Sequence, residues 1–550
     1  MTRIRLVAGI AVLALSGVTL AGQKPKFYAD DPLLRAPETV DASEVVDRDI
    51  VLSFDLAENL FGTPGELRKI KALNVNTIDE VPDSSWFTNR IGARPVPIEE
   101  AVRGPETGPG PAAGPLTVTR AKPSGVSAGF VLRDSAGETW FAQFDAPGYN
   151  EAASGAAMVA NKLFYTLGYW QTENQIAVLD PGQLLLGEKA VTETPSGKIR
   201  RLDRDDLMKL LKRAARGEDG TYRMLVSRGV PNSRGRFRYY GTRSDDPNDL
   251  VPHEHRRELR ALKVFGAWTN LVDMKAKNTL DALVKENGRM VVRHYLQDVG
   301  STFGTGALGP RDWDEGHELL YEGDPTWKRL ASLGFYRKPW QKVAYDEYES
   351  IGRFEGKAFD PVAWKPRVPT TAFLNARADD NFWAARRVMA FSNDLIRAIV
   401  KTGQYSDAAA EAHLAQVLIE RRDKIGRAYL PAVNPIVDPA LAGGALTFAN
   451  AAVDAGVAGA PTGGYRAEWF RFDNATGEAA SLGAPSTASG TRVGAPATLP
   501  SNDGAFVRVD LSAIDPPHAS WQTPVKIYFV RAGATWKLIG LERLPDGEAD

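Results

Sequence analysis

The chain contains no cysteine and only six histidines among its 550 residues. The absence of cysteine excludes disulfide bonds, thiolate metal sites, iron–sulfur clusters, cysteine nucleophiles and lipid anchors attached through cysteine. Six histidines leave little room for a histidine-rich metal centre. We therefore expect any bound metal ion to be held by oxygen atoms, as Mg²⁺ is.

An excess of charge of either sign is also missing. Lysine and arginine number 67 and aspartate and glutamate 68, so the formal net charge is −1. Because no net positive field is present to attract polyanions, we expect neither nucleic acid nor anionic lipid as a partner. The hydrophobic share of 43% is that of a globular protein, and the length predicts several domains rather than one core.

The first 22 residues have the pattern of an export signal. Arg3 and Arg5 precede an apolar run at residues 6–21, and small residues follow at Ala21 and Gly22. A signal peptide has this order of charge, apolar run and small residues, and the run is shorter than the roughly 20 residues that cross a membrane. A buried helix or a short membrane anchor is the alternative. We expect export to a bacterial periplasm or exterior, with no stable membrane span after cleavage.

The remaining chain divides by composition into five regions, and together they predict an α+β protein without internal repeats. An N-terminal extension with a Gly/Pro-rich linker is followed by a small sheet with one helix, a long helical region, an Ala/Gly/Pro-rich linker and a small β domain. Their expected bounds are 23–115, 116–180, 181–430, 431–463 and 464–550.

Two short polar motifs carry the strongest chemical signal. Asp273, Lys275 and Asn278 follow an apolar helical segment, and Asp298 opens an Asp-Val-Gly triplet further along. An amide oxygen and a carboxylate can hold Mg²⁺, which retains water and binds substrate phosphates. A second carboxylate can accept a hydroxyl proton while a lysine neutralises charge on a transferred phosphoryl group. A polar loop beside an ordinary surface turn is the alternative interpretation.

The segment between these motifs predicts how they come together. Two apolar stretches, 279–284 and 290–296, flank Asn287-Gly288, which is the strongest short signal for a β-hairpin with a type I′ turn. A hairpin centred there pairs positions whose numbers sum to 575, so Asn278 lies opposite Gln297. Cross-strand neighbours are about 5–8 Å apart, so the hairpin brings the asparagine beside the aspartate of the second motif.

This series, Asp-x-Lys-x-x-Asn, a hairpin and Asp-x-Gly, resembles the catalytic and metal loops of the protein-kinase-like superfamily, in particular its atypical HipA-like and CotH-like members. The resemblance covers about residues 116–430. It implies that Asp273 is the catalytic base, that Lys275 contacts the γ-phosphate, and that Asn278 and Asp298 bind the metal. It also implies ATP and Mg²⁺ as cofactors and phosphoryl transfer to the hydroxyl of an acceptor.

The same resemblance implies a bilobal fold, with a small β-rich N-lobe at 116–180 and a helical C-lobe at 181–430. The N-terminal extension and the C-terminal β domain match no kinase module. Residues 81–92 and 256–281 also resemble segments of a group of exported bacterial proteins.

The nucleotide-binding positions depart from the kinase pattern. Kinases carry a phosphate-binding lysine on the third strand, paired with a helix glutamate, and here Gln143 occupies the strand position while Glu151 starts the helix. Lys122 could substitute for the lysine, ahead of the glycine loop from Gly125 to Gly129. Without such a substitution, we expect either weak nucleotide binding or a catalytically dead pseudokinase that serves as a binding or envelope module.

A serine hydrolase is the second alternative. Ser127 lies in Gly125-Val-Ser-Ala-Gly129, which matches the Gly-x-Ser-x-Gly nucleophile elbow. The elbow needs a strand before the serine and a helix after it, whereas residues 130–132 read as a strand. The segment therefore fits a glycine-rich turn between two strands better than an elbow.

Overall fold

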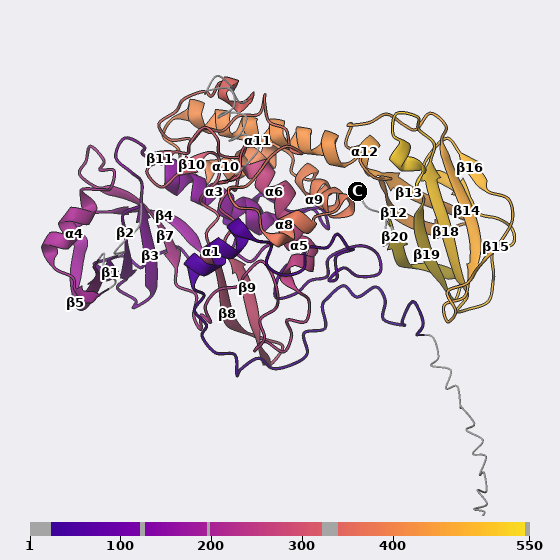
Figure 1. Ribbon diagram of the computed structural model, residues 1–550, viewed down its shortest axis with the longest axis horizontal. Helices are drawn as coiled ribbons and strands as arrows, with labels where there is room; N and C mark the ends of the chain where they lie inside the picture. The colour runs from indigo at the N-terminus through magenta and orange to yellow at the C-terminus, as the bar shows by residue number, and fades with distance from the viewer. Residues whose placement is uncertain (1–23, 122–126, 195–197, 322–338, 545–550) are drawn as a thin grey trace, which may run out of the picture.

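The computed structural model describes residues 24–121, 127–194, 198–321 and 339–544. A seven-stranded sheet lies at one end of the molecule, helices occupy the middle, and two further sheets lie at the other end (Figure 1). The fold is thus mixed α+β, as the sequence predicts. The expected signal peptide lies outside the described residues.

The N-terminal sheet has the strand order β4-β7-β3-β2-β1-β5-β6 and is antiparallel except where β1 pairs with β5. Alternation explains its strands: β3 buries Trp140, Ala142 and Phe144 and turns the residues between them outward, as period-two side chains must. Helix α3 lies against this sheet, between β3 and β4 in sequence. The elements are β1 (Leu116–Ala121), β2 (Gly129–Arg133), β3 (Thr139–Phe144), α3 (Ala152–Leu167), β4 (Asn174–Leu179), β5 (Leu184–Glu193), β6 (Ile199–Arg201), α4 (Arg204–Leu211) and β7 (Tyr222–Arg228).

The middle of the molecule is helical and surrounds one hairpin. Residues 378–401 form two helices, because Ser392 caps the second by accepting a hydrogen bond from the amide of Leu395 (3.1 Å). Among the described residues, no helix is both long and apolar enough to cross a membrane. The elements are α5 (Arg257–Arg260), α6 (Leu262–Thr269), β8 (Thr279–Glu286), β9 (Arg289–Leu296), β10 (Thr305–Gly306), β11 (Gly309–Pro310), α8 (Thr371–Asn375), α9 (Ala378–Met389), α10 (Asn393–Lys401) and α11 (Ala408–Tyr429).

The hairpin of β8 and β9 has the predicted register. Thr279 pairs with Leu296 and Glu286 with Arg289, so paired numbers sum to 575. The turn residues Asn287 and Gly288 have φ of 48° and 84°, as a type I′ turn requires at both central positions.

Two sheets form the C-terminal end, and their core continues into the helices. One large hydrophobic cluster joins Trp268 of α6 and Trp383 of α9 to Trp469 and Trp521, so the two regions share one core. The elements are β12 (Ile436–Ala442), β13 (Ala445–Asn450), α12 (Ala451–Asp454), β14 (Tyr465–Phe472), β15 (Ala479–Ser481), β16 (Ser486–Ala488), β17 (Arg492–Gly494), β18 (Phe506–Ala513), β19 (Val525–Ala532) and β20 (Thr535–Glu542).

The N-terminal extension runs along the molecule from the C-terminal sheets to the N-terminal sheet (Figure 1). Phe27 packs against Phe472 and Tyr528. Further along, helices α1 (Leu52–Phe61) and α2 (Ile98–Arg103) lie against the middle of the molecule, where α1 contacts residues 276–278 and α2 contacts α3 and α10.

Two expected boundaries differ from the structure. The N-terminal sheet continues past residue 180 to Arg228, because β7 inserts between β3 and β4. The expected linker at 431–463 contains the hairpin of β12 and β13, since Gly443 and Gly444, with φ of 56° and 70°, form the turn between two alternating strands. The strands contain many small residues, so the Ala/Gly/Pro-rich composition of the segment predicted a linker instead of a hairpin.

Candidate active site

The loop from Asn270 to Asn278 is anchored by its neighbours on both sides. Helix α6 ends at Asn270, which adopts a left-handed conformation (φ 55°) and receives the indole hydrogen bond of Trp364 (2.7 Å). The loop then buries Leu271, Val272 and Met274. Alternation with these buried residues leaves Asp273 and Lys275 partly exposed at the surface.

The predicted catalytic loop residues contact one another. The ammonium of Lys275 lies 2.8 Å from Oδ1 of Asp273, with side chains 37% and 22% exposed. Nδ2 of Asn278 donates to the backbone oxygen of Asp273 (2.9 Å). The lysine thus neutralises the carboxylate in a solvent-accessible position, and the asparagine fixes the curvature of the loop.

The second motif joins the same loop through the backbone. The amide of Asp298 donates to the oxygen of Asn278 (3.1 Å), and Oδ1 of Asp298 accepts from the amide of Gly300 (3.0 Å). Gly300 lies so close to α3 that a Cβ there would be 3.1 Å from the Cβ of Ala157. The hairpin therefore places Asp298 at the end of β9, beside the loop and close to α3.

The donor set suits a divalent cation held by oxygen. A backbone oxygen only accepts hydrogen bonds, so Nδ2 of Asn278 must face Asp273, and Oδ1 is left as the acceptor of the amide. Asp298 is exposed and offers a carboxylate. No group of three histidine, aspartate or glutamate side chains in the described ranges could hold a metal, so these two oxygens would need substrate phosphates and water to complete a Mg²⁺ site.

Gly129, Gln143 and Glu151 are the expected nucleotide-binding residues that the structure describes. Gln143 is half-buried in β3, paired with Gly129 of β2 and Leu225 of β7. Lys122 and Gly125 lie outside the described residues. A neutral amide on β3 cannot supply the charge that a lysine would give to the phosphates.

Glu151 has a different neighbour from the one that the resemblance implies. Its carboxylate accepts from the amide and hydroxyl of Ser406 (2.8 and 3.1 Å), which ties the start of α3 to the loop before α11. Glu151 occupies the N-cap position of α3, with φ of 67°. The carboxylate that accepts from the first turn is that of Asp145, from the amide and hydroxyl of Ser154 (2.8 and 2.6 Å).

A cavity of about 180 Å³ opens beside the loop from Asn270 to Asn278. Asp273 and Lys275 line it together with residues that the sequence did not indicate: Asp55 and Asn59 of α1, and Arg311 and Arg367. Both of these arginines pair with the buried Glu315, whose pKa is raised by burial. The cavity wall therefore combines elements far apart in the sequence.

Asp55 connects the N-terminal extension to the loop. Its side chain is buried, and burial raises its pKa despite the opposing charge of Arg238 and the amide of Ala276. Burial raises the pKa of Tyr239, and the negative charges of Asp273 and Asp55 raise it further. No pattern in α1 singles out Asp55 and Asn59 for this role, because Ser53 and Glu58 of the same helix are polar as well.

Ser127 does not have the setting of a nucleophile. It is 7% exposed and precedes strand β2, not a helix, so the strand–turn–helix geometry of an elbow is absent after it.

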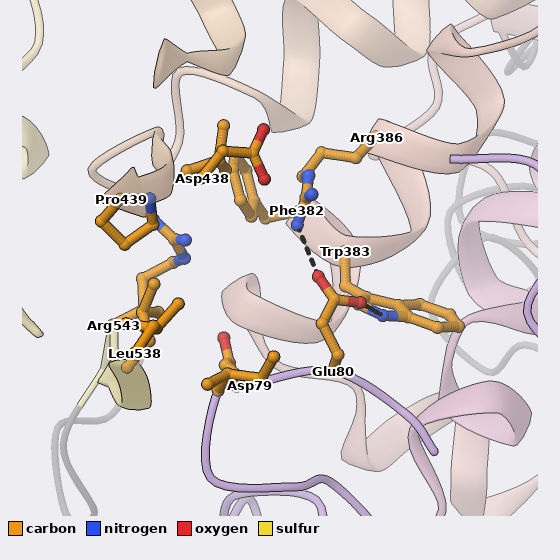
Figure 2. A pocket seen from close by; sticks show the side chains of 12 residues that line it. Asp79, Glu80, Phe382, Trp383, Arg386, Asp438, Pro439, Leu538 and Arg543 are labelled. Atoms are coloured by element: carbon orange, nitrogen blue, oxygen red, sulfur yellow. Dashed lines mark hydrogen bonds and ion pairs between the residues drawn. The ribbon is translucent and has the colours of Figure 1, made fainter. Parts of the chain in front are cut away.

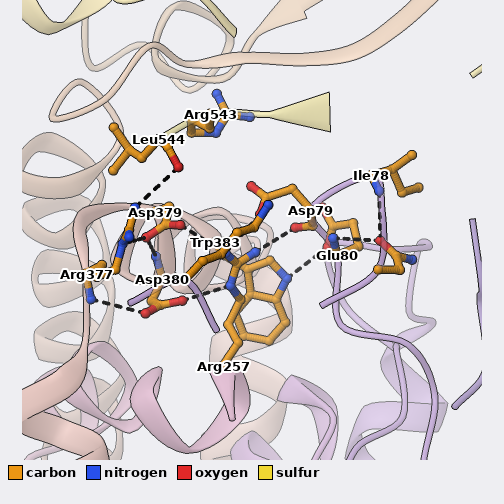
Figure 3. A network of polar contacts seen from close by, with 12 residues as sticks. Ile78, Asp79, Glu80, Arg257, Arg377, Asp379, Asp380, Trp383, Arg543 and Leu544 are labelled. Carbon is orange, nitrogen blue, oxygen red and sulfur yellow. Dashed lines mark hydrogen bonds and ion pairs between the residues drawn. The ribbon is translucent and has the colours of Figure 1, made fainter. Parts of the chain in front are cut away.

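A second, smaller cavity lies between three parts of the chain that pack together. It has a volume of about 80 Å³ and lies where residues 78–80, α9 and the C-terminal strands meet (Figure 2). The indole of Trp383 and the guanidinium of Arg386 both donate to Glu80 (2.9 and 2.8 Å). The adjoining ion pairs centred on Arg257 link the same elements (Figure 3). Because these polar groups already form hydrogen bonds and ion pairs with one another, we assign the cavity a structural role.

Among solved structures, crystal structures of the Golgi casein kinase match part of the chain. No protein-family model and no curated protein matches the chain. A crystal structure of the Golgi casein kinase with Mn and ADP bound aligns with a TM-score of 0.27, 10% identity and coverage of 57% of this chain and 74% of that one. A second structure of the Golgi casein kinase aligns with a TM-score of 0.28, 10% identity and coverage of 57% and 73%. Similarity of this size does not establish a shared fold or activity.

Proposed function

We propose that this protein is an exported, atypical kinase-like phosphotransferase that moves the γ-phosphoryl group of ATP to a hydroxyl group. The observation that carries the proposal is the linked set Asp273, Lys275, Asn278 and Asp298, joined by side-chain and backbone contacts of 2.8–3.1 Å. In the bilobal interpretation, the N-terminal sheet with α3 is the smaller lobe, and the site lies where α3 meets the helical part.

Each residue has one task in this reaction. The acceptor oxygen attacks the γ-phosphorus, the bond from that phosphorus to the bridging oxygen breaks, and ADP leaves. Asp273 accepts the hydroxyl proton. Lys275, released from Asp273, neutralises the transferred group. Asn278 and Asp298 would hold Mg²⁺, which supplies charge neutralisation at the phosphates.

A turnover measurement with matched variants tests the proposal. ADP formation from ATP and Mg²⁺, with water as acceptor, is measured for the wild type, Asp273→Asn and the control Asp394→Asn, whose carboxylate is 85% exposed on α10. Because removing a general base typically costs 10²–10⁴-fold, we expect a loss of about that size for Asp273→Asn only. Equal rates for all three proteins would contradict the assignment of Asp273.

A pseudokinase is the second candidate, and two observations favour it. Gln143 brings no charge to the third strand, and Glu151 is engaged by Ser406 instead of a strand residue. If nucleotide stabilises the wild type but no ADP forms above the buffer rate, this second function replaces the first.

A further inference from the structure

The cavity beside Asp273 has unused hydrogen-bond acceptors on its α1 side. Oδ1 of Asp55 and Oδ1 of Asn59 are buried and have no hydrogen-bond partner among the described residues. Asn59 uses its Nδ2 to donate to the backbone oxygen of Asp55 (2.7 Å), so its oxygen faces elsewhere. Buried acceptors without partners cost free energy, and a ligand with donor groups would satisfy them.

Charge restricts the kind of donor. Asp55 and Asp273 in the lining are opposed by the three cations Lys275, Arg311 and Arg367. Behind the lining, Glu315 pairs with both arginines and Arg238 pairs with Asp55, so these groups together carry one excess positive charge. Arg238 lies 3.8 Å from Asp55, an ion pair too long for a hydrogen bond. An ammonium group would be repelled by these cations, whereas a neutral hydroxyl group donates without adding charge.

Size and apolar lining restrict the ligand further. The volume of about 180 Å³ is below the roughly 300–1,000 Å³ typical of sites for drug-sized ligands. Leu56, Leu320 and Val368 line the cavity beside the polar groups. This combination suits a compact molecule with both C–H faces and several hydroxyl groups.

We propose that this cavity is the acceptor site, that its ligand is a small neutral polyol of monosaccharide size, and that Asp55 and Asn59 of α1 determine its specificity. The proposal rests on the proposed function, since the hydroxyl beside Asp273 is the one that receives the phosphoryl group. It assigns the N-terminal extension a direct part in the site, because α1 supplies both acceptors.

Direct binding tests the proposal separately from catalysis. Binding of D-glucose and myo-inositol is measured by ligand-observed NMR for the wild type, Asn59→Leu, Asp55→Asn and Ser53→Ala, the last on the exposed side of α1. We expect saturable binding of at least one polyol, weakened at least fivefold by Asn59→Leu and Asp55→Asn and unchanged by Ser53→Ala. N-acetylserine amide is the comparison ligand.

Three results would overturn it: no saturable binding of either polyol, equal binding by all four proteins, or binding of N-acetylserine amide in preference to the polyols. Stabilisation by ATP and Mg²⁺ is measured on the same samples. If nucleotide fails to stabilise any of them while polyol binding shows the expected pattern, the proposed function fails and the binding site stands. If all variants keep the nucleotide effect but none binds polyol, only the acceptor assignment fails.

Discussion

Replacing Arg257 by methionine should destabilise the protein strongly and in a pH-dependent way. Arg257 is fully buried, and its guanidinium lies 2.9 Å from Asp79, 2.9 Å from Asp380 and 3.3 Å from Asp379 (Figure 3). The buried network holds three cations and three carboxylates, namely Arg257, Arg260, Arg377, Asp79, Asp379 and Asp380. Removing one cation leaves three buried carboxylates to share two buried cations, and such an uncompensated buried charge costs about 3–5 kcal/mol.

The pH dependence separates this electrostatic cause from lost packing. Burial acts to raise the pKa of Asp79, but Arg257 and Lys71 hold it below its ordinary value. Without Arg257, burial dominates and the folded-state pKa rises above the unfolded one. Protonation of Asp79 then removes the buried charge of the variant. The difference in free energy of unfolding between the variant and the wild type should therefore shrink as the pH falls from 8 to 5.

Urea unfolding at several pH values between 5 and 8 measures this deficit. Arg397→Met is the control, because Arg397 is 52% exposed and its pair with Asp394 spans 3.4 Å at the surface; exposed pairs contribute about 0–1 kcal/mol. A deficit for Arg257→Met below about 1 kcal/mol, or one that stays constant across this pH range, would refute the reasoning.

Two further predictions concern the same core and the N-terminal extension. Burial and then Asp380 raise the pKa of Asp379 to about 6. The free energy of unfolding that the protonated Asp379 contributes should therefore be lost as the pH rises from about 4 through 6. Asp379→Asn should flatten that part of the urea profile, and an unchanged profile would contradict the shift. Gly235→Val should release residues 45–49, because a Cβ there would lie 1.8 Å from the oxygen of Arg48. Hydrogen exchange at 45–49 should rise for this variant and not for Gly490→Val, which has open space around it.

The parts of the site that local sequence determines were predictable. Asn287-Gly288 fixed the turn type, and the turn fixed the pairing register, so the neighbourhood of Asn278 and Asp298 followed from the numbering alone. In the same way, the buried residues that alternate with Asp273 and Lys275 determine which side chains of the loop are exposed. The local arrangement of a short polar motif can therefore be predicted from sequence when strongly apolar segments flank it.

The parts that depend on distant contacts were not predictable. Asp55 and Asn59 reach the catalytic loop from α1, and no pattern near them indicates this partner. β7 enters the N-terminal sheet between β3 and β4 only because tertiary pairing places it there. The hairpin of β12 and β13 is a different case, since Gly443-Gly444 between alternating strands is a hairpin signal that the Ala/Gly/Pro-rich composition concealed.

Nucleotide-dependent stabilisation of the wild type and Asp298→Asn tests the central claim most directly. If Asn278 and Asp298 form a metal-nucleotide site, ATP with Mg²⁺ at 100 times its Kd should stabilise the wild type by about 2.7 kcal/mol. The account predicts that this effect needs Mg²⁺, persists in Asp394→Asn and disappears in Asp298→Asn. No stabilisation of the wild type, or equal stabilisation of Asp298→Asn, would contradict it.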